Sequence, residues 1–123
     1  MVQVARGWDL DVERGPDWLF VRPHAPANLD DASLAEQVWG LLEQNFTIRL
    51  VLELDEIRYL SSSIIGQLVL LYKRIHTHQG MMRICGLSPR NEAVLALCRL
   101  GPMMPNYADR TEAVMCGRPL QPR

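Results

Sequence analysis

The segment that decides the fold is residues 57–74, which read IRYLSSSIIGQLVLLYKR. Three consecutive serines, residues 61–63, interrupt a chain that is apolar on both sides. Serine is a poor residue inside a helix but a good helix opener, because its hydroxyl can accept a hydrogen bond from a free backbone N–H of the first turn. The segment therefore predicts a helix from about residue 62 to 78 that stops at Gly80. A helix cap requires one serine, so capping does not explain the other two.

The length and composition of the chain limit its class. The sequence has 123 residues, with 13 Lys and Arg against 14 Asp and Glu, for a formal net charge of −1. This balance argues against a dedicated nucleic-acid binder. The first residues show neither the positively charged region nor the continuous apolar segment of a secretory signal. No apolar run approaches the roughly 20 residues that span a bilayer. Three widely spaced cysteines fit a reducing cytosol. We expect one cytoplasmic domain over residues 1–123, with frayed tails at about 1–6 and 117–123.

The residues on either side of the serines alternate between strand and helix patterns. Strand patterns occupy residues 8–15, 17–25, 49–55, 81–87 and 104–108. Helix patterns occupy residues 30–45, 62–78, 89–100 and 109–117, with Pro89 at a first helical position and Gly101 after a helix end. The order β-β-α-β-α-β-α-β-α predicts an α/β fold, in which helices pack against a mixed sheet of about five strands.

The region from Arg49 to Tyr107 resembles the STAS domain family, best known for the anti-sigma factor antagonists. The family typically shows an apolar strand, a turn motif of the form D-S-S/T-G-L-G, a helix ending at a glycine, and a later G-[LIV]-S-P helix start. Here the later motif reads Gly86, Leu87, Ser88 and Pro89. The resemblance implies a STAS-like fold, and over the first 48 residues only the order of elements agrees.

The serine turn departs from the family pattern at two positions. Ser61 stands where the family usually has Asp, and Ile64 stands at the first Gly of the motif, whereas Gly66 keeps the second Gly. The resemblance places the phosphorylation site of phosphorylatable members on Ser62. Serine and aspartate are near-equal helix caps, so the change at Ser61 removes a negative charge rather than the helix start. The alternative is that the three serines only cap the helix and turn the chain.

The helix after the serines carries a candidate partner surface. Its apolar arc is wider than a one-sided surface helix requires. One interpretation buries the whole arc under the sheet and neighbouring helices. The other leaves Ile64, Gln67 and Leu71 partly exposed for a partner. The predicted partner-binding set is Ser61, Ser62, Ser63, Ile64, Gly66, Gln67 and Leu71.

Other groups of reactive residues favour structural roles. His76 and His78 are two residues apart, on different faces of a helix and off metal-chelating spacing. Glu53 and Asp55 share one strand face, where an acid/base pair is conceivable, but such a pair more often marks a strand end that opens to solvent. Cys85 and Cys98 fall within apolar patterns and are expected to be core thiols.

These patterns predict a binding module rather than an enzyme, with no catalytic residue, cofactor or metal. The motifs of serine hydrolases, phosphate-loop enzymes and dinucleotide enzymes are absent. The resemblance implies an anti-sigma factor antagonist that binds an anti-sigma factor, often a serine kinase, and so frees a sigma factor. The alternatives are a constitutive STAS subunit of a signalling scaffold or lipid-transport assembly, and an enzyme with Ser62 as nucleophile. We expect neither nucleic-acid binding nor membrane insertion.

Overall fold

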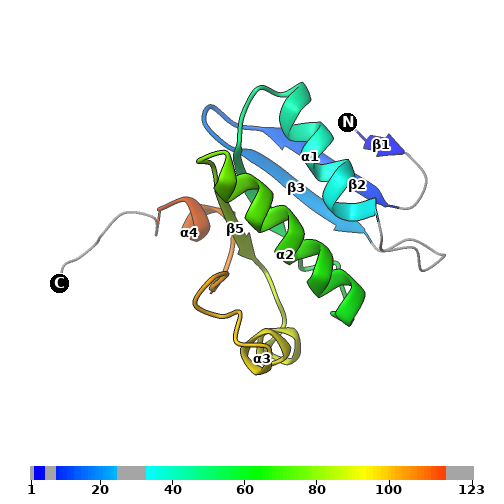
Figure 1. The fold of residues 1–123 in the computed structure, drawn as a ribbon, viewed down its shortest axis with the longest axis vertical. Coiled ribbons are helices and arrows are strands. Elements are labelled where there is room, and N and C mark those ends of the chain that lie inside the picture. Colours follow the sequence, from blue (N-terminus) through cyan, green and yellow to red (C-terminus); the bar gives the residue numbers. More distant parts are fainter. Residues whose placement is uncertain (1, 5–7, 25–32, 116–123) are drawn as a thin grey trace.

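One mixed sheet organises the protein. The computed structural model describes residues 2–4, 8–24 and 33–115. Its strands follow the spatial order β1-β2-β3-β4-β5-β6 (Figure 1). Pairing is antiparallel for β1 with β2 and β2 with β3, and parallel from β3 through β6. The strands are β1 (Val2–Val4), β2 (Asp9–Arg14), β3 (Leu19–His24), β4 (Arg49–Glu53), β5 (Met81–Cys85) and β6 (Asn106–Tyr107).

The helices divide between the two faces of the sheet. They are α1 (Leu34–Gln44), α2 (Ser62–Thr77), α3 (Pro89–Leu97) and α4 (Arg110–Met115). Helices α1 and α2 lie side by side in front of the sheet in Figure 1, and α3 lies below α2. Helix α4 packs against β4, β5 and β6. The predicted α/β class with helices packed on a mixed sheet is confirmed.

The N-terminal residues extend the sheet by one strand. Residues 2–4 pair with residues 9–11 as β1, which adds a strand to the roughly five that were predicted. The expected tail at 117–123 lies outside the described residues.

Two hydrophobic cores lie on opposite faces of the sheet. The larger core joins Leu50 and Leu52 of β4 to the inner faces of α1 and α2. The smaller core joins Val51 and Cys85 to Ala113 of α4. Because successive side chains of a strand point to opposite faces, the continuous apolar run of β4 supplies both cores. This central strand places the start of α2 at its own carboxyl end.

The long helix α2 ends in a Schellman motif that the sequence did not reveal. Gln79 is in the left-handed region, with φ of 64°, and Gly80 donates its N–H to the Ile75 carbonyl at 2.8 Å. Gly80 is therefore one residue beyond the expected C′ position. A Cβ at residue 80 would clash with the carbonyl oxygen of Ile48, the residue before β4, so this close approach requires glycine.

Substitutions at this helix end test whether Gln79 is the C′ residue of α2 and Gly80 the residue after it. Gln79→Gly should raise the free energy of unfolding by about 0.5–1 kcal/mol, because glycine adopts a positive φ without steric cost. Gly80→Ala should lower it by more than about 1 kcal/mol, because the added methyl group meets the backbone of Ile48. Urea denaturation measures both. Equal effects of the two substitutions would contradict the assignment.

Candidate functional site

The serine turn lies at the carboxyl end of β4. After Leu54 the chain makes a turn in which Ile57 donates its N–H to the Leu54 carbonyl at 3.1 Å. The side chains of Ile57 and Leu60 are buried, whereas Tyr59 is exposed. These two apolar anchors hold residues 57–60 against the core, so the serines that follow emerge at the surface.

A buried asparagine on α3 fixes this loop. Asn91 has no exposed surface, and its Nδ2 donates to the carbonyls of Ile57 at 3.1 Å and Arg58 at 3.4 Å. Its Oδ1 accepts from the Leu60 N–H at 3.2 Å. Backbone groups that are buried without a partner cost free energy, so one side chain satisfies three groups that the loop cannot pair with itself. Sequence reasoning missed Asn91, whose role depends on contacts more than thirty residues away.

The segment of residues 86–89, which reads GLSP, places α3 beside the loop of residues 57–60. Gly86 has a φ of 80°, and a Cβ there would lie 3.1 Å from the Cβ of Asp55. Glycine is the residue that accommodates both conditions. Ser88 then caps α3 by accepting from the Asn91 N–H at 3.2 Å, with Pro89 at the first helical position, as predicted.

The three serines have different roles at the start of α2. Ser61 is the N-cap, and its Oγ accepts from the Ile64 N–H at 3.1 Å. Ser62 and Ser63 are the first two helical residues, and both are exposed. Because Ser61 performs the capping, the Ser62 hydroxyl lies at the surface beside the free N–H groups and the positive end of the helix dipole. The predicted helix start is confirmed.

Two residues of the predicted partner set are core residues. Ile64 is 5% exposed and Leu71 is fully buried, so the expectation that they are partly exposed is wrong. Gln67 is half-buried, and its Oε1 accepts from the Ala35 N–H of α1 at 2.9 Å. It thereby satisfies a first-turn donor of α1 that Ser33 does not cap. Gln67 therefore ties α1 to α2.

The outward face of α2 is shifted by one residue from the one expected. Ser62, Gly66, Leu70 and Lys73 are all exposed and follow a spacing of four, four and three residues, which places them along one helical stripe. Leu70 is 58% exposed, although its neighbour Leu71 is buried. A one-residue shift turns a side chain by about 100° around the helix, so the phase of the apolar arc decides which leucine faces solvent. We call these four residues the outer stripe of α2.

Glu53 and Asp55 belong to an ion-pair cluster on the other face of the sheet. The buried carboxylate of Glu53 accepts hydrogen bonds from Nε and Nη2 of Arg110, at 2.9 Å each, and Asp55 pairs with Arg22 at 3.1 Å. The hydrogen bonds that Arg110 donates to Glu53 raise the pKa of Arg110 further above its usual range. Because Arg110 begins α4, this pair holds α4 on the sheet. The open strand end expected for Glu53 is wrong.

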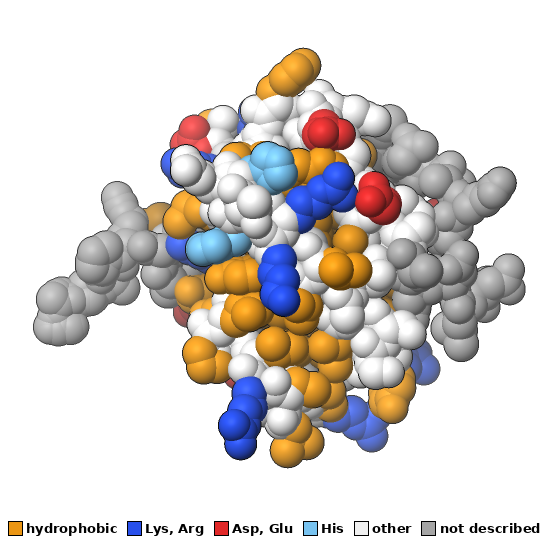
Figure 2. Space-filling view, viewed as in Figure 1, with side chains coloured by type: hydrophobic (Ala, Val, Ile, Leu, Met, Phe, Trp, Pro, Cys, Tyr) orange, Lys and Arg blue, Asp and Glu red, His pale blue; other side chains and the backbone are white. Residues whose placement is uncertain are grey.

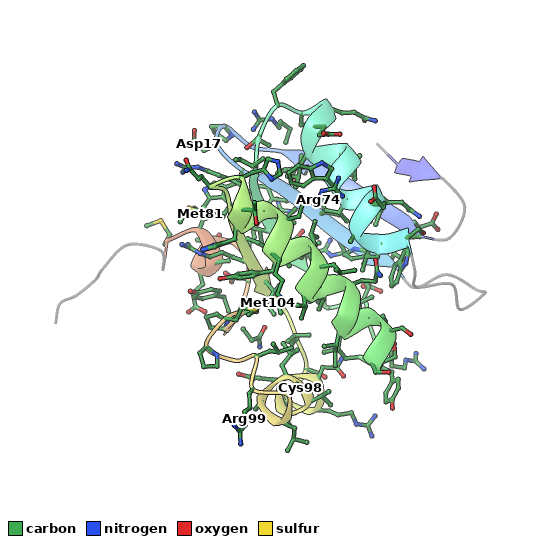
Figure 3. The ribbon with its side chains drawn as sticks, viewed as in Figure 1. Asp17, Arg74, Met81, Cys98, Arg99 and Met104 are labelled. Carbon is green, nitrogen blue, oxygen red and sulfur yellow. The ribbon has the colours of Figure 1, made fainter. Side chains whose placement is uncertain are left out.

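The histidines and cysteines have separate environments. His76 stacks on Tyr72, and His78 lies against Trp39. Cys85 is buried, which raises the pKa of its thiol to about 12, whereas Cys98 at the end of α3 is exposed, against expectation (Figure 3). Among residues 2–4, 8–24 and 33–115, no three His, Cys, Asp or Glu side chains could hold a metal ion together. None of the helices in these ranges is both long and apolar enough to cross a bilayer.

A nucleophile–base pair is not assembled at Ser62. Among the described residues, no histidine contacts Ser62. His76 lies fourteen positions further along α2, or about 21 Å at the helical rise of 1.5 Å per residue. His24 directs its Nε2 to Asp11 at 2.8 Å, and this hydrogen bond lowers the pKa of Asp11.

The sheet, its helices and the exposed serine turn define a small α/β domain that presents a helix start to its surroundings. The STAS domain model matches residues 12–113, and the chain belongs to this family. A Thermotoga maritima protein proposed to be an anti-sigma factor antagonist is similar in structure, with a TM-score of 0.77 at 20% identity, over 86% of this chain and 92% of that one.

Two further solved structures share the fold. An anti-sigma factor antagonist from Mycobacterium paratuberculosis gives a TM-score of 0.71 at 20% identity, covering 87% of this chain and 91% of that one. The Bacillus cell fate determinant SpoIIAA in its phosphorylated form gives 0.64 at 18% identity, covering 89% and 99%. At these identities the likeness establishes the fold.

Removal of the Asn91 side chain tests its hold on the loop. Asn91→Ala should lower the free energy of unfolding by about 2–3 kcal/mol, because it leaves the backbone groups of residues 57–60 without partners. The control is Asn45→Ala, which removes a single side-chain bond to the Leu41 carbonyl and should cost about 1 kcal/mol or less. Urea denaturation measures the free energy of unfolding of both variants. A decrease in Asn91→Ala no larger than that in Asn45→Ala would contradict the anchoring role.

Proposed function

We propose that the chain is an anti-sigma factor antagonist, a cytoplasmic binding module whose partner is an anti-sigma factor with serine kinase activity. Binding of that factor releases a sigma factor for transcription. Phosphorylation of Ser62 by the kinase switches the binding off. The proposal rests on the family and on the structural likeness to proteins of that name.

The observation that carries the switch is the exposed hydroxyl of Ser62 at the first position of α2. In the transfer, Ser62 Oγ loses its proton and takes the terminal phosphoryl group of the ATP that the kinase holds, and ADP leaves. The product carries about −1.5 to −2 charges at neutral pH. That charge suits the positive end of α2, so the fold tolerates it. A partner seated on the turn meets a charged, hydrated group instead of a small hydroxyl.

The binding surface that fits this proposal is the serine turn together with the outer stripe of α2. Gly66 lies one turn after Ser62, and a Cβ there would have no neighbour within 4 Å. A partner can therefore approach the helix backbone closely beside Ser62. The exposed Leu70 then supplies an apolar contact two turns along the helix. In this arrangement Ile64, Gln67 and Leu71 support the surface from below.

A constitutive STAS subunit of a signalling scaffold or lipid-transport assembly is the second candidate. The observation that favours it is the absence of an acidic residue from the first turn of α2, with Ser61 at the cap where the family usually has Asp. Such a subunit would keep the same binding surface and would not be phosphorylated.

Ser62→Asp tests the switch. The Ser62→Asp variant should bind the partner captured from native cells at least about tenfold more weakly than wild type does, which corresponds to about 1.4 kcal/mol. Its free energy of unfolding should stay within about 1 kcal/mol of wild type, because a carboxylate suits a helix start. The matched control is Thr111→Asp, which places the same charge in the first turn of α4, on another face of the protein.

Mass spectrometry of the native chain supplies the second readout. Phosphorylation adds about 80 Da, and the increment should map to Ser62. Binding by Ser62→Asp that equals binding by Thr111→Asp would overturn the switch. A chain that never carries phosphate on Ser62 in its own cells would favour the constitutive subunit.

A further inference from the structure

The charges of the chain are segregated around the serine turn. Residues 57–105 contain six Lys and Arg and a single acid, Glu92, for a net charge of +5. The other residues of the chain contain seven Lys and Arg against thirteen Asp and Glu, for a net charge of −6. The near-neutral total therefore conceals a basic segment that includes α2 and α3.

Four of the six cations are available at the surface. Arg74 pairs with Glu36 of α1 at 3.1 Å, and Arg83 donates to the Ala113 carbonyl of α4 on the other face of the sheet. The remaining cations are exposed and form no ion pair with any described residue: Arg58, Lys73, Arg90 and Arg99. We call these four the basic face.

The acids nearest to the basic face are directed elsewhere. Asp55 pairs with Arg22, and Glu56 lies 4.0 Å from His24, so both face β3. Glu92 is within 3.5 Å of the side-chain amide of Asn106 in β6. Unpaired cations with their acids turned away produce a positive potential over the surface.

Two of the four cations, Arg58 and Arg90, lie next to the serine turn, whereas Lys73 is eleven residues further along α2 and Arg99 follows the end of α3. Asn91 bonds the carbonyl of Arg58, so the backbone of Arg58 lies beside the first turn of α3, which contains Arg90. The exposed apolar side chains of this region are Tyr59, Leu70 and Leu97. Figure 2 shows hydrophobic side chains gathered over α2 and α3 with Lys and Arg among and around them, while the prominent acidic side chains of this view lie above them.

We infer that the partner of the serine turn is a protein that presents an acidic surface around an apolar centre. The inference rests on the proposed function and specifies the chemistry of the partner. Three of the four cations are arginines and one apolar residue is a tyrosine, and both types are enriched where binding energy concentrates in protein interfaces. Complementary charge speeds the encounter, and the apolar contacts hold the complex.

The same charges explain how phosphorylation of Ser62 alone can weaken binding of the partner. A phosphoryl group on Ser62 adds about −1.5 to −2 charges beside Arg58 and Arg90. It therefore offsets part of the attraction for an acidic partner and adds repulsion at the serine turn. The switch acts mainly on the rate of association, because long-range charge governs encounter more than residence.

Association kinetics with the purified partner test the inference. The probe is the protein whose capture Ser62→Asp abolishes. The association rate constant of wild type should fall at least about tenfold between 50 and 500 mM NaCl. Arg58→Glu with Arg90→Glu should lower it about tenfold at 50 mM NaCl, with dissociation changed by less than about threefold. The control is Arg14→Glu at the end of β2, an exposed arginine whose hydrogen bonds with described residues go to the carbonyls of residues 15 and 16.

The possible outcomes separate this inference from the proposed function. If no protein is captured in a Ser62-dependent manner, the proposed function fails and takes the inference with it. If such a protein binds equally fast at both salt concentrations, and the double variant matches Arg14→Glu, the inference alone is overturned. Binding to vesicles of 70% phosphatidylcholine and 30% phosphatidylserine, lost in the double variant, would instead assign the basic face to anionic lipid. Circular dichroism verifies that each variant is folded.

Discussion

The exposed serine turn depends on the buried side chain of Asn91. Residues 57–60 run between a strand and a helix and form neither, so their backbone groups need partners from elsewhere. One amide on α3 supplies them through hydrogen bonds to Ile57, Arg58 and Leu60. Gly86 brings α3 close enough for these bonds to form. The serines are therefore positioned by tertiary contacts on their N-terminal side and by the core packing of α2 on their C-terminal side.

This construction separates the fold from the surface that we assign to a partner. Ser61 caps α2, and Ile64 and Leu71 pack in the core, so the structural requirements of the turn are met without Ser62. A group added to the Ser62 hydroxyl has no buried contact to break. The charge of that group instead acts on the exposed cations next to the turn, Arg58 and Arg90. A modification can thus alter recognition and leave the stability of the domain nearly unchanged.

The sequence predicts the features that depend on neighbours along the chain. Periodicity gives the strands and helices in order, and the cap at Ser88 with Pro89 gives the start of α3, because these signals are local. The site is less predictable because it depends on tertiary contacts. The exposure of Leu70 in place of Leu71 depends on the rotation of α2 against the sheet. The roles of Asn91 and Gln67 depend on partners about thirty residues away. The family resemblance supplies Ser62 as the site of modification, which residue patterns alone leave open.

Hydrogen exchange at the Leu60 amide is the sharpest test of whether phosphorylation of Ser62 leaves the turn anchored. This N–H donates to Asn91 Oδ1 and reports whether the loop stays anchored when Ser62 is modified. We predict that the amide is protected to the same extent, within about threefold, in the unmodified chain and in the chain that carries phosphoserine at residue 62, because protection tracks the free energy of local opening. Loss of that protection on phosphorylation would contradict the account, since the modification would then act by unfolding the turn.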